Sequence, residues 1–160
     1  MESTNSTSRT SPKEPGIIFF DGYCTLCNRW VDFLMRVLST RSAKSAHFPF
    51  QIASLQGATA KKILVQSGRS AFITPPLNSI VLYQRAIMED APQFLTESDA
   101  ILRIFSALGF PWSMFGVFRL VPRVIRDFIY RVIAKNRYQW FGKRETCRMP
   151  TQEERKFLLD

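Results

Sequence analysis

The stretch IIFFDGYCTLC, residues 17–27, decides the expected fold. It begins with four apolar residues, Ile17–Phe20, and such short runs are typical of a strand buried on both faces. Asp21 and Gly22 then interrupt the run. From Cys24 onward the apolar residues recur at steps of three and four, as in a helix: Leu26, Trp30, Phe33, Leu34, Val37 and Leu38. We therefore predict a strand, a turn and a helix over about residues 24–38.

Cys24 and Cys27 form a C-x-x-C pair at the start of this predicted helix. The first turn of a helix presents unpaired N–H groups and the positive end of the helix dipole, and both favour a thiolate. In such settings the pKa of a cysteine falls from about 8.5 to roughly 3.5–7.5. Since the thiolate is the attacking species in disulfide exchange, the setting predicts a redox-active pair.

The spacing also predicts different roles for the two thiols. Cys24 lies outermost on the helix, so we expect it to be exposed and to act as the nucleophile. Cys27 lies one turn further in, so we expect it to be shielded and to resolve the mixed disulfide. Asp21 has two interpretations, a proton acceptor for Cys27 or a turn and cap residue. Tyr23 either flanks the reactive sulfur in a substrate groove or simply packs.

The rest of the chain predicts an α/β fold with a mixed four-stranded sheet flanked by helices. Two strands joined through a helix favour a parallel β-α-β unit, and a later strand pair can form a hairpin across a tight turn at Gln84 and Arg85. Thr96 or Ser98 is a candidate cap for the third helix. The predicted strands cover residues 17–20, 48–53, 79–83 and 86–88, and helices cover about 24–38, 55–67 and 97–108, with a further C-terminal helix opened by Pro122.

Length and composition indicate one domain, residues 16–160, preceded by a disordered Ser/Thr-rich tail over residues 1–15. Fourteen Phe and 46% hydrophobic residues are typical of a folded protein. No apolar run reaches the roughly 20 residues of a membrane span, and no secretory signal is evident. We therefore expect a cytoplasmic protein. Three Cys are too few for a disulfide scaffold.

The net charge of +9 is concentrated in residues 119–148, which hold nine basic and two acidic residues. A solvated helix face is the simplest interpretation. The mixture of large apolar residues and Arg over residues 110–148 also fits a weak contact with an anionic surface or membrane. Tyr138, Trp140 and Phe141 lie among basic residues, but no RNA-binding motif surrounds them. We expect these aromatic residues to cover the core, and we expect no nucleic-acid partner.

Several separate blocks of this chain resemble one protein family. They are FDGYCTLCN at residues 20–28, ASLQ at 53–56, SDA at 98–100, Tyr130, AKNRYQWFGK at 134–143, and Cys147. They resemble the DCC family of predicted thiol–disulfide oxidoreductases, which is named for its Asp, Cys and Cys. The resemblance implies a thioredoxin-like fold and a redox-active Cys24–Cys27 pair, with Asp21 as the third signature residue. We expect no cofactor beyond that disulfide.

The chain departs from thioredoxins themselves at the third strand. Thioredoxins place a cis-proline directly before this strand, whereas Asn78 and Ser79 precede Ile80 here. We therefore expect a substrate groove formed by Tyr23, Asn78 and Ser79 whose peptide-binding edge differs. The expected partners are a disulfide or dithiol substrate and an electron donor that the sequence does not identify.

Two alternatives to redox chemistry remain. Cys24, Cys27, His47 and Cys147 together supply a Cys₃His set for zinc, although the last two lack a paired spacing. We expect no metal, with His47 as a turn residue. Cys147 is either a second resolving thiol or a packing residue. The other alternative is a redox-silent interaction module.

Overall fold

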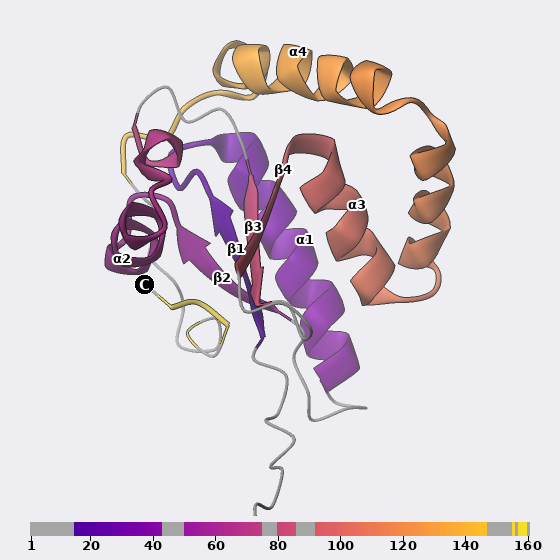
Figure 1. Cartoon of the computed structure of the whole chain (residues 1–160), viewed down its shortest axis with the longest axis horizontal. Helices are drawn as coiled ribbons and strands as arrows, with labels where there is room; N and C mark the ends of the chain where they lie inside the picture. The colour runs from indigo at the N-terminus through magenta and orange to yellow at the C-terminus, as the bar shows by residue number, and fades with distance from the viewer. Residues whose placement is uncertain are drawn as a thin grey trace, which may run out of the picture.

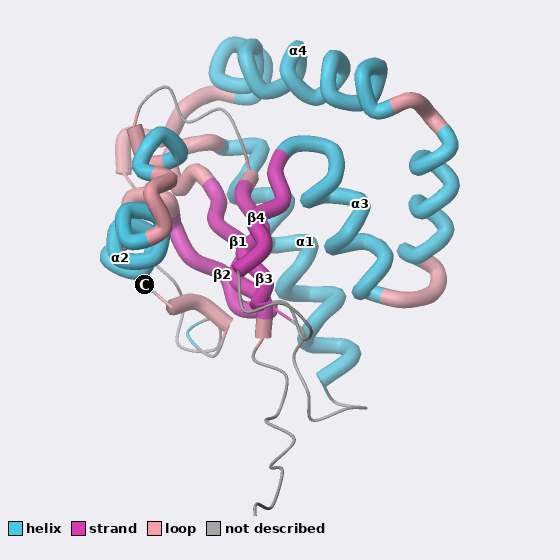
Figure 2. Tube along the Cα trace, viewed as in Figure 1, coloured by secondary structure: helices cyan, strands magenta, loops and turns pink. Residues whose placement is uncertain are grey.

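A computed structural model of the 160-residue chain describes residues 15–42, 50–74, 80–85, 92–146, 155 and 157–159. Strands and helices alternate through the first half of the chain. Two consecutive strands follow, and helices form the described chain from Glu97 to Phe141 apart from short connections (Figures 1 and 2). The strands are β1 (Gly16–Phe20), β2 (Phe50–Ser54), β3 (Val81–Arg85) and β4 (Pro92–Thr96). The helices are α1 (Thr25–Ser42), α2 (Ala58–Gln66), α3 (Glu97–Leu108) and α4 (Arg123–Phe141), with 3₁₀ helices η1 (Ser70–Phe72) and η2 (Trp112–Leu120).

The four strands form one mixed sheet in the order β2-β1-β3-β4. β1 pairs in parallel with β2, and Ile18 lies opposite Ile52. β3 runs antiparallel to both β1 and β4. This arrangement confirms the predicted α/β class, the β-α-β unit and the mixed four-stranded sheet, and it is consistent with a thioredoxin-like fold.

Helices cover both faces of the sheet, which explains why β1 is apolar at every position. Side chains alternate along a strand. Ile18 therefore packs with Leu34 of α1 and Ile104 of α3 in one core cluster. Ile17 and Phe19 point to the opposite face, where they pack with Leu64 of α2. Figure 1 shows α2 on one side of the sheet and both α1 and α3 on the other.

The first helix extends further than predicted, through Ser42 rather than ending at Leu38. At its polar end the hydroxyls of Ser39 and Thr40 donate to the carbonyl oxygens of Met35 and Arg36, one turn earlier, so these side chains are satisfied within the helix. α2 begins at Ala58 rather than at the predicted residue 55. It ends at Gln66, and the predicted stop, Gly68, follows with φ of +67°. α3 spans the predicted residues, and Thr96 precedes it without a side-chain capping bond.

The predicted tight turn at Gln84 and Arg85 is wrong. Both residues belong to β3 and pair with Gln93 and Pro92 of β4. Polar residues at the end of a sheet give no alternating apolar signal, so the sequence pattern placed the turn too early. The strand predicted at residues 86–88 lies outside the described residues, as does residue 79 at the predicted start of the third strand. The predicted tail also lies outside them, apart from Pro15.

The C-terminal helices leave the sheet and return over its end (Figure 1). In η2, Trp112 packs edge-on against Phe33 of α1, with ring centroids 4.7 Å apart. α4 then begins directly after Pro122, as predicted, and crosses the end of the sheet at which β1 leads into α1. Along the described part of the chain, no helix combines the length and apolar content that crossing a bilayer requires.

Candidate active site

The Cys24 turn connects the end of β1 with the start of α1. The Cys24 amide donates to the Asp21 carbonyl (3.2 Å), and the Asn28 amide donates to the Cys24 carbonyl (3.0 Å). The Asn28 side chain is buried and donates from Nδ2 to the carbonyl oxygens of Gly22 and Cys24, both at 2.8 Å. These bonds hold the turn closed, so Cys24 is fixed at the first turn of the helix.

Cys24 carries the more acidic of the two thiols. A hydrogen bond from the Cys27 side chain is the main cause that lowers the pKa of Cys24 to about 7. The Cys27 amide also donates to Cys24 Sγ over 3.2 Å, and the nearby Arg137 guanidinium adds to the lowering. The same hydrogen bond, together with burial, raises the pKa of Cys27 above its usual range. The pair therefore favours a thiolate at Cys24 and a protonated thiol at Cys27.

The predicted exposure of the two thiols is wrong. Cys24 has 0% of its surface exposed, whereas Cys27 is partly exposed. The cause is a segment more than a hundred residues away, Gly142–Arg144, which we call the closing segment. It lies antiparallel beside Cys24, with Lys143 opposite that residue. The Arg144 amide donates to the Tyr23 carbonyl (2.8 Å), and the Thr25 amide donates to the Gly142 carbonyl (3.4 Å).

Asp21 is buried and accepts hydrogen bonds at both carboxylate oxygens. Oδ1 accepts from the Tyr23 amide (3.1 Å) and from Gln56 Nε2 (2.8 Å). Oδ2 accepts from the Arg137 guanidinium (3.0 Å) and from the Tyr138 hydroxyl. The bond to Tyr23 agrees with the turn interpretation of Asp21. The carboxylate also connects the end of β1 with the loop after β2 and with α4.

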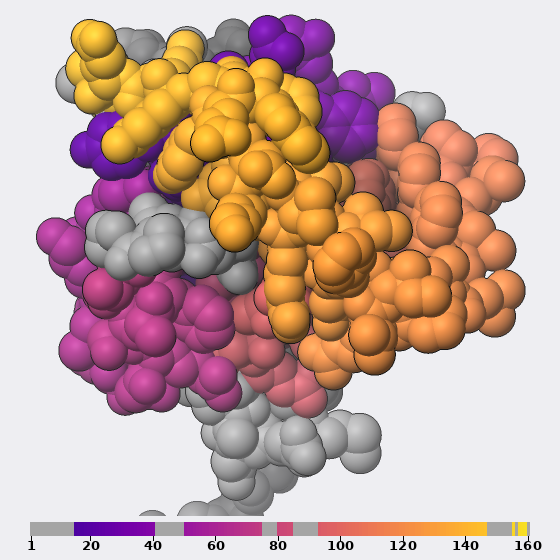
Figure 3. Space-filling model, turned by 90° about the horizontal axis from the view of Figure 1, so that it is seen from above, coloured from indigo at the N-terminus to yellow at the C-terminus, as the bar shows by residue number. Residues whose placement is uncertain are grey.

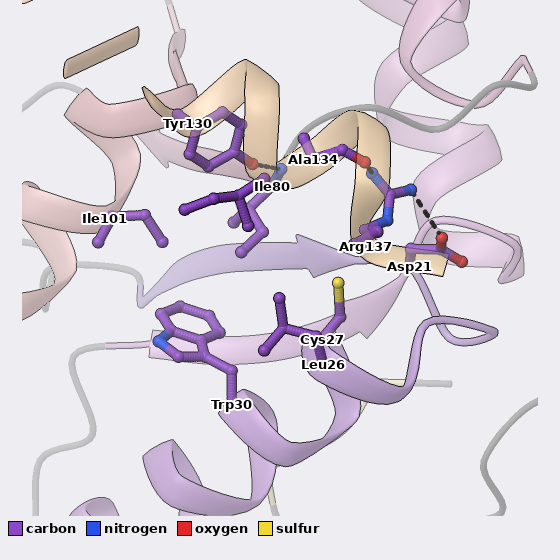
Figure 4. A pocket seen from close by; sticks show the side chains of 10 residues that line it. Asp21, Leu26, Cys27, Trp30, Ile80, Ile101, Tyr130, Ala134 and Arg137 are labelled. Atoms are coloured by element: carbon purple, nitrogen blue, oxygen red, sulfur yellow. Dashed lines mark hydrogen bonds and ion pairs between the residues drawn. The ribbon is translucent and has the colours of Figure 1, made fainter. Parts of the chain in front are cut away.

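A cavity of about 200 Å³ lies between α1, α3 and α4 beside the cysteine pair. Figure 4 shows the Cys27 sulfur pointing into this cavity, toward α4. Arg137 and Asp21 lie together at one end, joined by their ion pair. Most of the lining is apolar, and the lining residues are Asp21, Leu26, Cys27, Trp30, Ile80, Ile101, Tyr130, Ile133, Ala134 and Arg137.

Tyr130 fixes one wall of the cavity. Its hydroxyl accepts a hydrogen bond from the Ile80 amide (2.8 Å), at the position where β3 is about to begin. Burial raises the pKa of Tyr130 to about 12, so the side chain is neutral at physiological pH. α4 is therefore attached to the sheet by a neutral hydrogen bond and to the Cys24 turn by an ion pair.

The structure brings together Asp21, Cys24, Cys27 and Tyr23, whose half-buried ring lies 5.9 Å from Lys143 Nζ. The other predicted groove residues, Asn78 and Ser79, lie outside the described residues. So do His47 and Cys147 of the alternative zinc set. Among the described residues no group of three or more His, Cys, Asp or Glu is placed to bind a metal ion.

Sequence reasoning missed the residues that support the site from a distance, namely Gln56, Tyr130, Arg137 and Tyr138. Each of them lies in one of the sequence blocks that resemble the family, and this resemblance is the signal in the sequence that could have marked them as site residues. The aromatic residues near the end of α4 were expected to cover the core, which is wrong for two of them. Trp140 and Phe141 are exposed, and Tyr138 alone is half-buried, against Asp21.

The chain is similar to known proteins of one family. The sequence profile of the DCC1-like thiol-disulfide oxidoreductase family matches residues 18–143. The uncharacterized protein YuxK of Bacillus subtilis (strain 168) is 35% identical over 151 residues, which cover 94% of this chain and 98% of that protein. A DCC family protein of Arabidopsis thaliana, described as chloroplastic, is 31% identical over 83% of this chain and 69% of its own length. No solved structure matches. The chain therefore belongs to the DCC1-like thiol-disulfide oxidoreductase family.

Proposed function

We propose that this protein reduces a substrate disulfide or oxidises a substrate dithiol through the Cys24–Cys27 pair, with Cys24 as the nucleophile and Cys27 as the resolving thiol. The observation that carries the proposal is the difference between the two thiols. The pKa of Cys24 is lowered to about 7, whereas the pKa of its hydrogen-bonded neighbour Cys27 is raised. A fixed thiolate beside a protonated thiol is the arrangement that two-step disulfide exchange requires.

In the reducing direction, the Cys24 thiolate attacks one sulfur of a substrate disulfide. A mixed disulfide forms, and the first substrate sulfur leaves as a thiolate. Cys27 then passes its proton to the departed substrate thiolate and attacks Cys24 Sγ, which forms the Cys24–Cys27 disulfide and releases the second substrate thiolate. Two electrons pass from the protein to the substrate. A thiol reductant would restore the dithiol by the same steps in reverse.

Asp21 acts in this proposal as a positioning residue. Both of its carboxylate oxygens accept hydrogen bonds, and one of them faces Arg137 in a buried ion pair. The alternative, in which Asp21 accepts the Cys27 proton, predicts a specific defect. Asp21→Asn would then slow the second step while leaving the rate of the first step unchanged, measured at a pH where Cys24 is fully ionised. A positioning role predicts that the first step slows as well.

The cavity supports a small apolar substrate rather than a protein loop. It reaches Cys27 but not the buried Cys24, so a disulfide held there meets the Cys24 sulfur only once the closing segment loosens. The polar side chains of the cavity are already engaged within the protein: Tyr130 with Ile80, and Arg137 with Asp21. A site of about 200 Å³ has room for roughly one aromatic ring, since a dry cavity of about 150 Å³ binds benzene. We propose a neutral aromatic or branched aliphatic disulfide as substrate. We place the protein in a reducing compartment such as the cytoplasm, where a dithiol persists.

The trapping experiment tests the assigned roles. Cys27→Ser should accumulate a mixed disulfide with a small aromatic disulfide, because the second step is lost. Cys24→Ser should neither turn over nor accumulate the adduct. Mass spectrometry of the intact protein distinguishes the two outcomes. Adducts on Cys27 in the Cys24→Ser variant, formed as fast as those on Cys24, would reverse the assignment.

A further inference from the structure

α4 is amphipathic, but its polar side faces the protein and its apolar side faces outward. Its two buried residues are Asp127 and Arg137, one acid and one base. The apolar residues of its first three turns point outward instead. Phe128 is 66% exposed and Ile129 is 53% exposed. A surface helix normally buries its apolar stripe, so the outward orientation of this stripe in α4 needs a physical explanation.

The cause is a set of polar bonds that fix the rotation of α4. Asp127 accepts a hydrogen bond from Ser98 of α3, and Arg126 pairs with Asp99 at 3.2 Å. Further along the helix, Arg137 pairs with the buried Asp21 at 3.0 Å. Turning the helix over would break these contacts and leave Asp21 buried without its guanidinium. The polar side of α4 therefore has to face the site, and the apolar side of the helix has to point outward.

The outward apolar face is large. Of the sixteen large hydrophobic residues that are exposed in the described parts of the chain, fourteen lie between residues 110 and 141. They come from two consecutive elements and the turns beside them. They are Phe110, Met114, Phe115, Val117, Phe118, Leu120, Val124, Ile125, Phe128, Ile129, Val132, Ile133, Trp140 and Phe141. We call these fourteen residues the apolar face. Figure 3 looks at the molecule from above, and the orange residues of α4 lie across its front, nearest the viewer.

Positive charge accompanies the apolar face. Arg119, Lys135, Lys143 and Arg144 are exposed, and none of the four forms an ion pair with a described residue. On the same stretch the acidic side chains are Asp127, which is buried and paired, and Glu145. Two copies of a chain with net charge +9 would bring like charges together if they met through this face. A negatively charged lipid surface would complement it.

We propose that the apolar face lies on an anionic membrane surface. Helices that bind in the plane of a membrane combine large apolar and aromatic side chains with Lys and Arg, and both components contribute to their affinity. Ile133 is exposed and also lines the cavity beside Cys27. The bound protein would therefore carry its cavity next to the lipid. Membrane binding itself does not depend on the proposed redox function.

Sedimentation with vesicles tests the proposal on the full chain. Wild-type protein should bind phosphatidylcholine vesicles that contain phosphatidylglycerol, and high salt should weaken the binding. The double variant Phe128→Ser, Ile129→Ser should bind at least about tenfold more weakly, because two apolar side chains no longer enter the interface. Lys135→Gln should lower binding to anionic vesicles about fivefold and leave binding to pure phosphatidylcholine unchanged.

Val65→Ser is the matched control. Val65 is 54% exposed but lies on α2, away from the apolar face, so its substitution should not change vesicle binding. All these side chains are exposed, and the melting temperatures should stay close to that of the wild type. Three results would overturn the proposal: a wild type that does not bind, equal binding by the double variant, or a wild-type dimer that the double variant converts to a monomer. The last result would identify a second copy as the occupant.

Discussion

At the scale of residues, the site depends on how a few polar side chains meet around the Cys24 turn. The cysteine pair and Asp21 could be predicted, because they lie together in a stretch whose strand and helix patterns are clear. Gln56 and Arg137 could not be predicted as partners of Asp21, since they lie 35 and 116 residues away from it along the chain. An isolated polar residue does not reveal its partner in a sequence.

The hydrogen bond between the two thiols makes a testable prediction about acidity. Alkylation of Cys24 should show a midpoint at a pH of about 7, with the thiolate present above that pH and lost below it. Cys27→Ala removes the donor, so the midpoint should rise toward about 8.5, the value for a free cysteine. Cys27→Ser retains a hydroxyl donor and should keep a lower midpoint. Equal midpoints in the two variants would show that the side-chain hydrogen bond is not the main cause.

Asp21→Asn should destabilise the protein. The Asp21 and Arg137 side chains are only 3% and 6% exposed, and the substitution leaves a buried guanidinium without its carboxylate. The free energy of unfolding should fall by about 3 kcal/mol, measured by urea denaturation. Glu145→Gln, at an exposed acid, is the control and should change it by less than about 0.5 kcal/mol. A similarly small effect of Asp21→Asn would mean that the ion pair adds little to stability.

At the scale of elements, periodicity identified most helices and strands but not their surroundings. The pattern of α3 was clear, and its bounds were predicted correctly. The β3–β4 turn was misplaced, because Gln84 and Arg85 continue the strand without an apolar signal. For α4 the sequence showed an apolar stripe, but it did not show whether this stripe would face the core or point outward. That choice follows from polar bonds to Ser98, Asp99 and Asp21, which only the tertiary structure brings near.

The closing segment should control access to Cys24. Arg144→Pro removes the amide that donates to the Tyr23 carbonyl, so the segment should loosen over the sulfur. We expect Cys24 to react several-fold faster with iodoacetamide, at a pH where it is fully ionised. Arg144→Ala retains the amide and should react like the wild type. Unchanged rates in the proline variant would indicate that reagents reach Cys24 by another route, such as the cavity.

Filling the cavity should affect substrate use without affecting the thiolate. Ala134 lines the cavity from α4, and Ala134→Leu adds bulk there. The value of kcat/KM for a small neutral aromatic disulfide should fall several-fold, while the pKa of Cys24 stays the same. Ala107→Leu, at an exposed position on α3, is the control and should leave both unchanged. If Ala134→Leu has no effect on kcat/KM, the substrate does not enter the cavity.

At the scale of the whole molecule, the C-terminal half completes a site that the N-terminal half begins. The turn after β1 and the first turn of α1 supply the two thiols. α4 and the closing segment supply the guanidinium, one cavity wall and the cover over Cys24. The class of fold could be predicted, because buried strands and amphipathic helices leave strong local patterns. The closed state of the site could not, because it depends on residues 137–144 returning to the Cys24 turn.

The most direct test of the central claim is a redox titration of the wild-type protein in glutathione buffers, followed by peptide mass analysis. We expect one two-electron transition between about −270 and −120 mV. The oxidised form should lack two hydrogens within the peptide that holds Cys24 and Cys27. Two thiols that stay free across this range, or that form only separate adducts with glutathione, would contradict the account.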